Sequence, residues 1–177
     1  MSKDSIALIG FMATGKTTIG KALAKRLGNN YKFIEMDQLI IQEVGKSISK
    51  IFDEEGEAKF REYEISVCEK VSKLKKVVIS CGGGVVINPE NIENLRKNCY
   101  VILLTASIEE IYKRIIKDGK KSRPLIKKED SLEEMKKLLI ERQSLYKSAA
   151  DLVIDTSEKQ INRIVDMILV FYNQVKV

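Results

Sequence analysis

The stretch Gly10-Phe-Met-Ala-Thr-Gly15-Lys16-Thr17-Thr18 decides the fold class of this chain of 177 residues. It follows the apolar run at 6–9, opens a segment with helical periodicity, and has the P-loop spacing G-x-x-x-x-G-K-[ST]. Its glycines let the backbone curl until successive N–H groups surround a phosphate at a helix N-terminus. Lys16 can reach the β- and γ-phosphates, and the Thr17 hydroxyl can ligate Mg²⁺. The motif therefore predicts nucleoside triphosphate binding.

Short apolar segments alternate with amphipathic segments along the rest of the chain. The expected strands are residues 6–9, 32–35, 77–80, 100–104 and 152–154, and the expected helices lie near 17–27, 57–73, 89–97, 107–117, 131–149 and 158–175. Strands that are apolar throughout are buried on both faces, as in a mainly parallel sheet. Because the sequence shows no internal repeat or linker, we expect one α/β domain over residues 1–177, with helices on both faces of the sheet.

The composition excludes several classes of function. Histidine is absent, which removes imidazole bases, Ser–His and Cys–His nucleophile pairs and most zinc sites. The three scattered cysteines fit reduced thiols in a cytoplasmic protein. No apolar run reaches the length of a membrane span, and residues 1–5 show no secretory signal. The net charge of +6 suits an anionic ligand such as a nucleotide but does not by itself exclude nucleic acid.

Missing motifs disfavour two large classes of P-loop protein. A regulatory GTPase would carry N-K-x-D for guanine, which this sequence lacks. A motor or transporter ATPase usually has an apolar strand that ends in Asp beside the metal, whereas the third expected strand ends in Ser80 and Cys81. A small phosphotransferase remains, in which the protein positions two substrates and neutralises the charge on the transferred phosphoryl group.

Polar residues and glycines at the expected carboxyl ends of strands are candidates for binding the second substrate. Glu35 and Asp37 would share one face if the chain stays extended there. One carboxylate could then hold hydrated Mg²⁺ while the other accepts a proton, or both could simply cap the next helix. Gly82-Gly83-Gly84 would allow a ligand to approach the backbone closely, or would form a flexible turn.

Two arginines are candidates for binding an acidic acceptor. Arg61 shares a helix face with Glu64 at i, i+3, which fits either a surface ion pair or a fork that binds a substrate carboxylate. Arg142 falls along an apolar stripe and, if buried, needs an anionic partner. The expected stripe contains Leu132, Met135, Leu139 and Leu145.

The segment 118–130 is basic and contains one glycine and one proline. Such a segment is commonly a solvated loop. In a P-loop kinase it could instead be a lid that closes over the phosphates and excludes water.

In combination these motifs resemble those of the shikimate kinases. They are G-F-M-A-T-G-K-T-T, the carboxylate pair around Asp37, I-F-D-E-E-G-E-A-K-F-R-E-Y-E at 51–64, G-G-G at 82–84, R-P-L at 123–125 and E-R-Q-S-L-Y-K-S-A-A-D at 141–151. Their joint order is specific, and the resemblance extends from about residue 6 to the final helix. It implies the nucleoside monophosphate kinase fold, with a three-layer α/β/α arrangement and a five-stranded parallel sheet. It also implies transfer of the ATP γ-phosphoryl group to the 3-hydroxyl of shikimate, in the route to chorismate and aromatic amino acids.

The resemblance implies a role for each residue at the acceptor end. Asp37 would hold the ring hydroxyls and act as the base for the attacking one. The carboxylate of shikimate would be bound by Arg61, Arg142 and the backbone of Gly82, Gly83 and Gly84. Residues 38–64 would form a shikimate-binding segment.

The resemblance also implies the residues of the nucleotide end. Thr17 would ligate Mg²⁺ directly, and Glu35 and Ser80 would act through its water ligands. Arg123, in a lid at about 118–130, would contact the transferred phosphate beside Lys16. The remaining ATP-binding residues would be Ala13, Thr14, Gly15, Thr18 and, against the adenine, Arg114.

Two residues depart from the family pattern, and three other functions stay open. The family usually has glycine at the position of Ala13 and aspartate at that of Glu35. The alternatives are another small-molecule kinase such as a gluconate kinase, a catalytically silent binding module and a polynucleotide-end kinase. The last is disfavoured because the chain has no tryptophan and few aromatic residues to stack on bases. We expect a cytoplasmic monomer that uses ATP, Mg²⁺ and shikimate, with no nucleic-acid or membrane partner.

Overall fold

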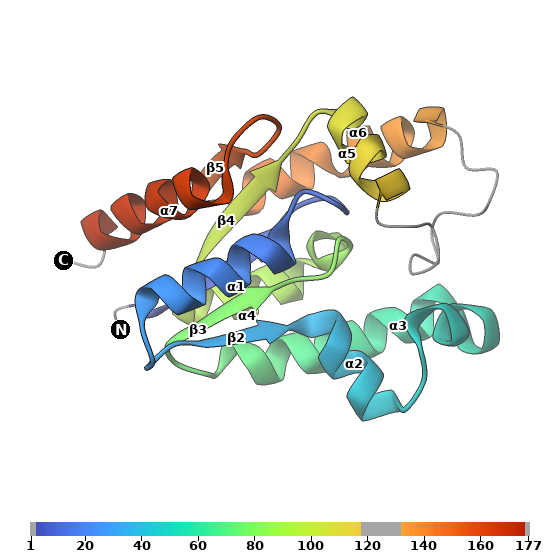
Figure 1. Cartoon of the computed structure of the whole chain (residues 1–177). Coiled ribbons are helices and arrows are strands. Elements are labelled where there is room, and N and C mark those ends of the chain that lie inside the picture. Colours follow the sequence, from blue (N-terminus) through green and yellow to red (C-terminus); the bar gives the residue numbers. More distant parts are fainter. Residues whose placement is uncertain (1–2, 118–131, 176–177) are drawn as a thin grey trace.

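A parallel sheet between two layers of helices forms the protein in the computed structural model, which describes residues 3–117 and 132–175 (Figure 1). The strands are β1 (Ser5–Ile9), β2 (Lys32–Glu35), β3 (Val77–Ser80), β4 (Cys99–Thr105) and β5 (Leu152–Asp155). Their spatial order is β2-β3-β1-β4-β5, and every pairing is parallel. The expected five-stranded α/β fold is confirmed, and each expected strand agrees to within one residue at either end.

Helices bury the two faces of the sheet in separate cores. On one face lie α1 (Lys16–Leu27) and α7 (Ile161–Val175), which pack on β1 through Ile6 and Leu8. On the other face, Ala7 and Ile9 meet a second core. This core is built by α2 (Met36–Val44), α3 (Ile48–Ser72), α4 (Pro89–Asn98), α5 (Ile108–Lys117), α6 (Leu132–Ala149) and the short 3₁₀ helix η1 (Val85–Ile87). Among these described helices, none is long and apolar enough to cross a membrane.

The chain after β2 departs from the expected extended conformation. β2 ends at Glu35, and α2 begins at the next residue, so Asp37 lies in the first turn of a helix. The apolar side chains of Met36 and Ile40, spaced one turn apart, are fully buried and explain why the helix begins there. The prediction that Glu35 and Asp37 share a face of an extended chain is therefore wrong. Glu35 occupies the N-cap position, but its side chain makes no capping hydrogen bond.

The helix that carries Arg61 is longer than expected and contains a kink. It begins at Ile48, nine residues before the expected start at 57, and Gly56 inside it has φ 83° and ψ 169°. Because L-residues avoid this conformation, Gly56 divides the helix into two pieces. Ser47 caps the first piece by accepting a hydrogen bond from the Lys50 N–H at 3.3 Å. The first piece brings Ile48 and Phe52 over the same cavity as Arg61.

Gly10, the first glycine of the P-loop, is required by both its conformation and its surroundings. Its φ is +141°, and a methyl group on it would overlap the Leu104 carbonyl oxygen of β4. Gly28, after α1, also has a positive φ, +99°, but a methyl group there would meet open space. Alanine substitutions at the two positions therefore separate the free-energy cost of a positive φ, which both share, from the cost of the clash with β4, which only Gly10 has.

We expect Gly10→Ala to lower the free energy of unfolding by about 2 kcal/mol more than Gly28→Ala. The reason is that the first change adds a clash with the fixed backbone of β4 to the conformational strain that both changes share. Urea unfolding followed by circular dichroism measures the difference. Equal losses in the two variants would show that the packing of the P-loop against β4 contributes nothing.

Candidate active site

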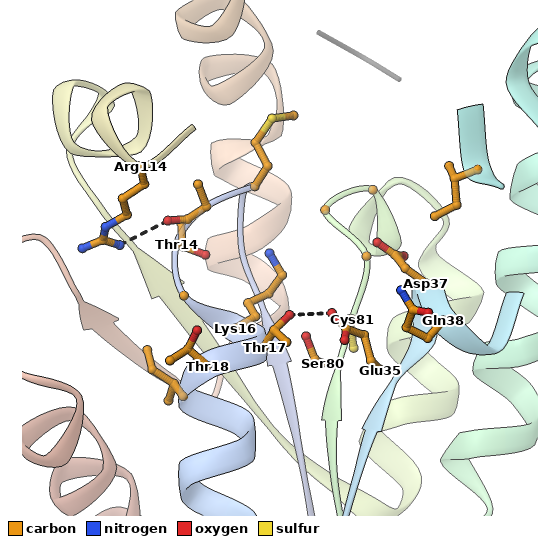
Figure 2. A pocket seen from close by; sticks show the side chains of 18 of the residues that line it. Thr14, Lys16, Thr17, Thr18, Glu35, Asp37, Gln38, Ser80, Cys81 and Arg114 are labelled. Carbon is orange, nitrogen blue, oxygen red and sulfur yellow. Dashed lines mark hydrogen bonds between the residues drawn. The ribbon is translucent and has the colours of Figure 1, made fainter. Parts of the chain in front are cut away.

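A cavity of about 1050 Å³ lies at the carboxyl ends of the strands (Figure 2). It is lined by the P-loop, the start of α2, the middle of α3, the glycine loop (residues 82–84), α6 and the turn after β5. Figure 2 shows Arg114 at one side of the P-loop and Asp37 at the other, with Lys16 between them. The volume exceeds that of most single-ligand pockets, so there is room for two substrates side by side. This is also the edge of an open α/β sheet at which ligands bind.

The P-loop lysine and threonine are held by short hydrogen bonds. The Lys16 Nζ donates to the carbonyl oxygens of Gly10 and Phe11, at 2.8 Å each. The Thr17 hydroxyl donates to the Glu35 carboxylate at 2.5 Å (Figure 2). Glu35 is the last residue of β2 and lies opposite Ser80, the last residue of β3, in the parallel pairing of these strands. The three residues predicted to surround Mg²⁺ are therefore brought together.

The chemistry of this oxygen cluster fits Mg²⁺ bound jointly by protein and nucleotide. A hydroxyl, a carboxylate and a serine are hard oxygen ligands, and Mg²⁺ usually keeps several waters and takes the rest of its ligands from phosphates. Within residues 3–117 and 132–175, no group of three or more acidic or cysteine side chains could hold a metal alone.

Ala13 occupies a left-handed backbone conformation, with φ 59°, inside the P-loop. Arg114 braces this strained residue, because its Nη1 donates to the Ala13 carbonyl oxygen at 3.1 Å (Figure 2). The same guanidinium donates through Nη2 to the Thr156 carbonyl oxygen at 2.7 Å and through Nε to Glu110 at 2.9 Å. Thr14 is buried and its hydroxyl donates to the Phe11 carbonyl oxygen, so its side chain supports the loop itself.

Asp37, which is half-buried, and Glu64, which is buried, form an acidic pair at the other end of the cavity. Burial raises the pKa of both carboxyl groups, against the opposing effect of Lys16 on Asp37 and of Arg61 on Glu64. A methyl group on Gly82 would lie 2.8 Å from the Asp37 Oδ1 and 2.9 Å from the Glu64 Oε1. Any larger residue there would therefore displace the two carboxylates. A carboxylate of raised pKa is a better proton acceptor.

Arg61 forms the predicted ion pair with Glu64 and also lines the cavity, while its binding of a substrate carboxylate stays a prediction. Its Nη1 donates to the Glu64 carboxylate at 2.8 Å and its Nη2 to Glu57 at 2.9 Å. Its Nε and the Glu64 Oε1 are buried without a hydrogen-bond partner among the described residues. Buried polar atoms of this kind need a partner, and a ligand in the cavity can supply one.

Arg142 is buried, as its position on α6 suggested, with 7% of its surface exposed. Its Nη1 lies 3.4 Å from the Gly83 carbonyl oxygen. Leu145, expected on the buried stripe, is 40% exposed, and that prediction is wrong. The stripe continues instead one turn beyond Arg142, through Tyr146, which the sequence reasoning missed although its i, i+4 spacing from Arg142 is visible in the sequence.

Two predicted features lie outside the described residues: the lid at 118–130 and, within it, Arg123. The other predicted site residues all line the cavity. Residues 13–18 line it on the P-loop side, and Asp37, Arg61, residues 82–84 and Arg142 line it on the acceptor side. Basic and acidic groups therefore face one space in which a phosphate donor and a carboxylated acceptor could meet.

The family model for shikimate kinase matches residues 12–173 of this chain. The chain belongs to the shikimate kinase family. A shikimate kinase of Caldanaerobacter subterraneus subsp. tengcongensis is 43% identical over 172 residues, which cover 97% of this chain and 98% of the relative. The solved shikimate kinase of Acinetobacter baumannii in complex with shikimate matches with a TM-score of 0.91 and 32% identity, covering 99% of this chain and 96% of that one.

Membership of the shikimate kinase family settles the class of reaction. The enzyme is an ATP-dependent phosphotransferase that acts on a hydroxyl group of shikimate. A gluconokinase of Sinorhizobium meliloti shares the fold with a TM-score of 0.59 and 16% identity, covering 98% of this chain and 93% of that one. At that identity the likeness concerns the fold alone.

Proposed function

We propose that the cavity performs this reaction with the nucleotide over the P-loop and shikimate between Asp37, Arg61 and Arg142. The single observation that carries the proposal is the cluster of Asp37, Arg61, Glu64 and Arg142 in the cavity, in which Glu64 and Arg142 are buried and Asp37 and Arg61 are half-buried. The guanidinium groups of Arg61 and Arg142 can bind one substrate carboxylate through charge-assisted hydrogen bonds. Because burial raises the pKa of Asp37, its carboxylate can accept the proton of a substrate hydroxyl.

At the acceptor end, Asp37 accepts the proton of the 3-hydroxyl as the oxygen attacks the γ-phosphorus. Arg61 and Arg142 bind the carboxylate of shikimate, and the backbone of the glycine loop completes the pocket. The segment 38–64, which includes Arg61 on α3, supplies this wall together with Asp37, the residue just before it on α2. Holding the ring at both its carboxylate and its hydroxyls fixes the attacking oxygen, which accounts for much of the catalysis in phosphoryl transfer.

At the nucleotide end, the N–H groups of Ala13, Gly15 and neighbouring residues surround the phosphates, and Lys16 leaves its loop carbonyls to bind the β- and γ-phosphates. When bound with ATP, Mg²⁺ supplies neutralisation of the phosphate charge. Thr17 would hold it directly, with Glu35 and Ser80 holding its waters. Arg114 would contact the adenine. On the resemblance alone, Arg123 contacts the transferred phosphate from a lid at 118–130.

The proposal includes a cytoplasmic monomer. Its support is the family resemblance together with Cys68, Cys81 and Cys99, which are buried and form no disulfide in the described chain. Burial raises the pKa of the Cys68 and Cys99 thiols to about 12, so both stay protonated and unreactive at neutral pH.

Gly84 offers a test of the acceptor wall, because a methyl group on it would overlap the Arg61 guanidinium. The flexible side chain would move rather than the backbone. We expect Gly84→Ala to raise the KM for shikimate roughly tenfold or more, since small misplacements of a positioning group are costly. The KM for ATP serves as the internal control and should stay unchanged. A normal KM for shikimate would remove Arg61 from the proposed site.

The proposed reaction is tested by identifying its product. Incubation with ATP, Mg²⁺ and shikimate should give a phosphomonoester whose ³¹P resonance correlates with the ring proton at carbon 3. A correlation with another ring position would overturn the proposed orientation of the acceptor. Release of inorganic phosphate without an ester would overturn the transfer itself.

A further inference from the structure

Tyr146 is a buried tyrosine whose side chain interacts with Arg142 and with the glycine loop. It lies on α6 one turn beyond Arg142 and is 2% exposed. Its hydroxyl donates a short hydrogen bond to the Gly83 carbonyl oxygen. Burial raises the pKa of the phenol to about 12, so the group remains a hydrogen-bond donor throughout the neutral range.

The Gly83 carbonyl differs from its two neighbours in where its hydrogen bond comes from. The Gly82 carbonyl accepts from the Val85 N–H at 3.2 Å, and the Gly84 carbonyl accepts from the Ile87 N–H at 2.9 Å. These bonds close turns inside the loop itself. The Gly83 carbonyl is instead tied to α6, the helix that carries Arg142.

Fixing this carbonyl fixes the next N–H group as well. The peptide bond is planar and trans, so the Gly83 carbonyl and the Gly84 N–H belong to one rigid unit and point in opposite directions. A run of glycines would otherwise leave that peptide free to rotate, because glycine populates positive and negative φ almost equally. The Arg61 guanidinium lies against Gly84, so rotation of this peptide would also disturb Arg61.

We propose that Tyr146 is a positioning residue for the acceptor, which holds the Gly83–Gly84 peptide in the orientation that binds the carboxylate of shikimate. The inference rests on the proposed acceptor site. It assigns α6 two connected tasks: Arg142 contributes the charge, and Tyr146, one turn later, holds the backbone that faces the same anion.

The test replaces the hydroxyl alone, by Tyr146→Phe. We expect the KM for shikimate to rise roughly three- to tenfold, the value of one lost neutral hydrogen bond, with the KM for ATP unchanged. Tyr172→Phe is the matched control. Tyr172 is also buried, 1% exposed, and its hydroxyl is bonded to that of Tyr31 at 2.7 Å, but it lies on α7 on the far face of the sheet. The control should leave both KM values unchanged.

The outcomes separate positioning from general packing. An unchanged KM for shikimate in Tyr146→Phe overturns the proposal, as do equal rises in both KM values. If the wild type fails to phosphorylate shikimate, the proposed function fails on its own, before any variant is compared.

If Tyr146→Phe does not fold, a second measurement tests the proposal. Incorporation of 3-fluorotyrosine at 146 keeps the shape of the ring and strengthens its donor. The amide NMR resonance of Gly84 in the ligand-free protein should then shift, because that N–H shares a peptide with the hydrogen-bonded carbonyl. An unshifted resonance overturns the proposal.

Discussion

Asp37→Asn is expected to lower kcat for shikimate phosphorylation by roughly 10²–10⁴-fold, the usual contribution of a general base. Asparagine keeps the size of the side chain but cannot take the proton of the attacking hydroxyl. The position of Asp37 favours this role, because it lies in the first turn of α2, beside Lys16, in surroundings that raise its pKa through burial. Steady-state kinetics with saturating ATP measure the loss.

The binding of ATP should survive this substitution. The Lys16 ammonium donates to the carbonyl oxygens of Gly10 and Phe11, and these two bonds do not involve the Asp37 carboxylate, which the substitution replaces. Titration calorimetry with ATP checks this directly. The control is Asp166→Asn, an exposed aspartate of α7 paired with Arg26 at 2.8 Å, which should leave kcat unaltered. Undiminished turnover in Asp37→Asn, or loss of ATP binding, would refute the assigned role.

Arg142→Ala is expected to raise the KM for shikimate roughly 10- to 150-fold, the value of a hydrogen bond to a charged group. The effect is large because Arg142 is buried, so water cannot replace it effectively beside the carboxylate. The KM for ATP should change little, since the Arg142 guanidinium lies against the Gly83 carbonyl oxygen of the glycine loop. Initial rates over a matrix of both substrate concentrations separate the two constants.

The methyl ester of shikimate sharpens the test of Arg142. The ester lacks the negative charge, so the wild type should strongly prefer the free acid, and Arg142→Ala should lose most of that preference. Arg26→Ala removes an exposed arginine of α1 and should keep the full preference. If Arg142→Ala discriminates between acid and ester as well as the wild type does, Arg142 does not bind the carboxylate.

The fold was predictable because its signals are local. The inner strands β1, β3 and most of β4 are buried on both faces as expected, whereas the edge strands β2 and β5 are partly exposed, and the P-loop follows β1 as the motif requires. Asn88 caps α4 by accepting from the Glu90 N–H at 2.9 Å, with proline in the next position, as both residue types favour. What failed was the conformation just after β2, because the alternation rule was extended across Glu35 into residues that the burial of Met36 and Ile40 makes helical.

Residues whose charged side chains line the cavity could be predicted from the sequence. Contacts that depend on backbone groups could not. Asp37, Arg61 and Arg142 carry charges that the sequence shows directly. The i, i+4 spacing of Tyr146 from Arg142 is also visible, but the sequence does not show that the Tyr146 hydroxyl reaches a peptide carbonyl. The same applies to Ala13, whose left-handed backbone is supported from α5 by Arg114, more than a hundred positions later in the sequence.

The most direct test of the central claim is coupled ADP release with a panel of acceptors in the presence of ATP and Mg²⁺. The panel contains shikimate, gluconate, nucleoside monophosphates and a 5′-hydroxyl oligonucleotide. The account predicts release with shikimate alone. Release with another acceptor, or with none although the folded protein binds ATP, would contradict the assignment of the cluster around Asp37, Arg61 and Arg142 to the acceptor.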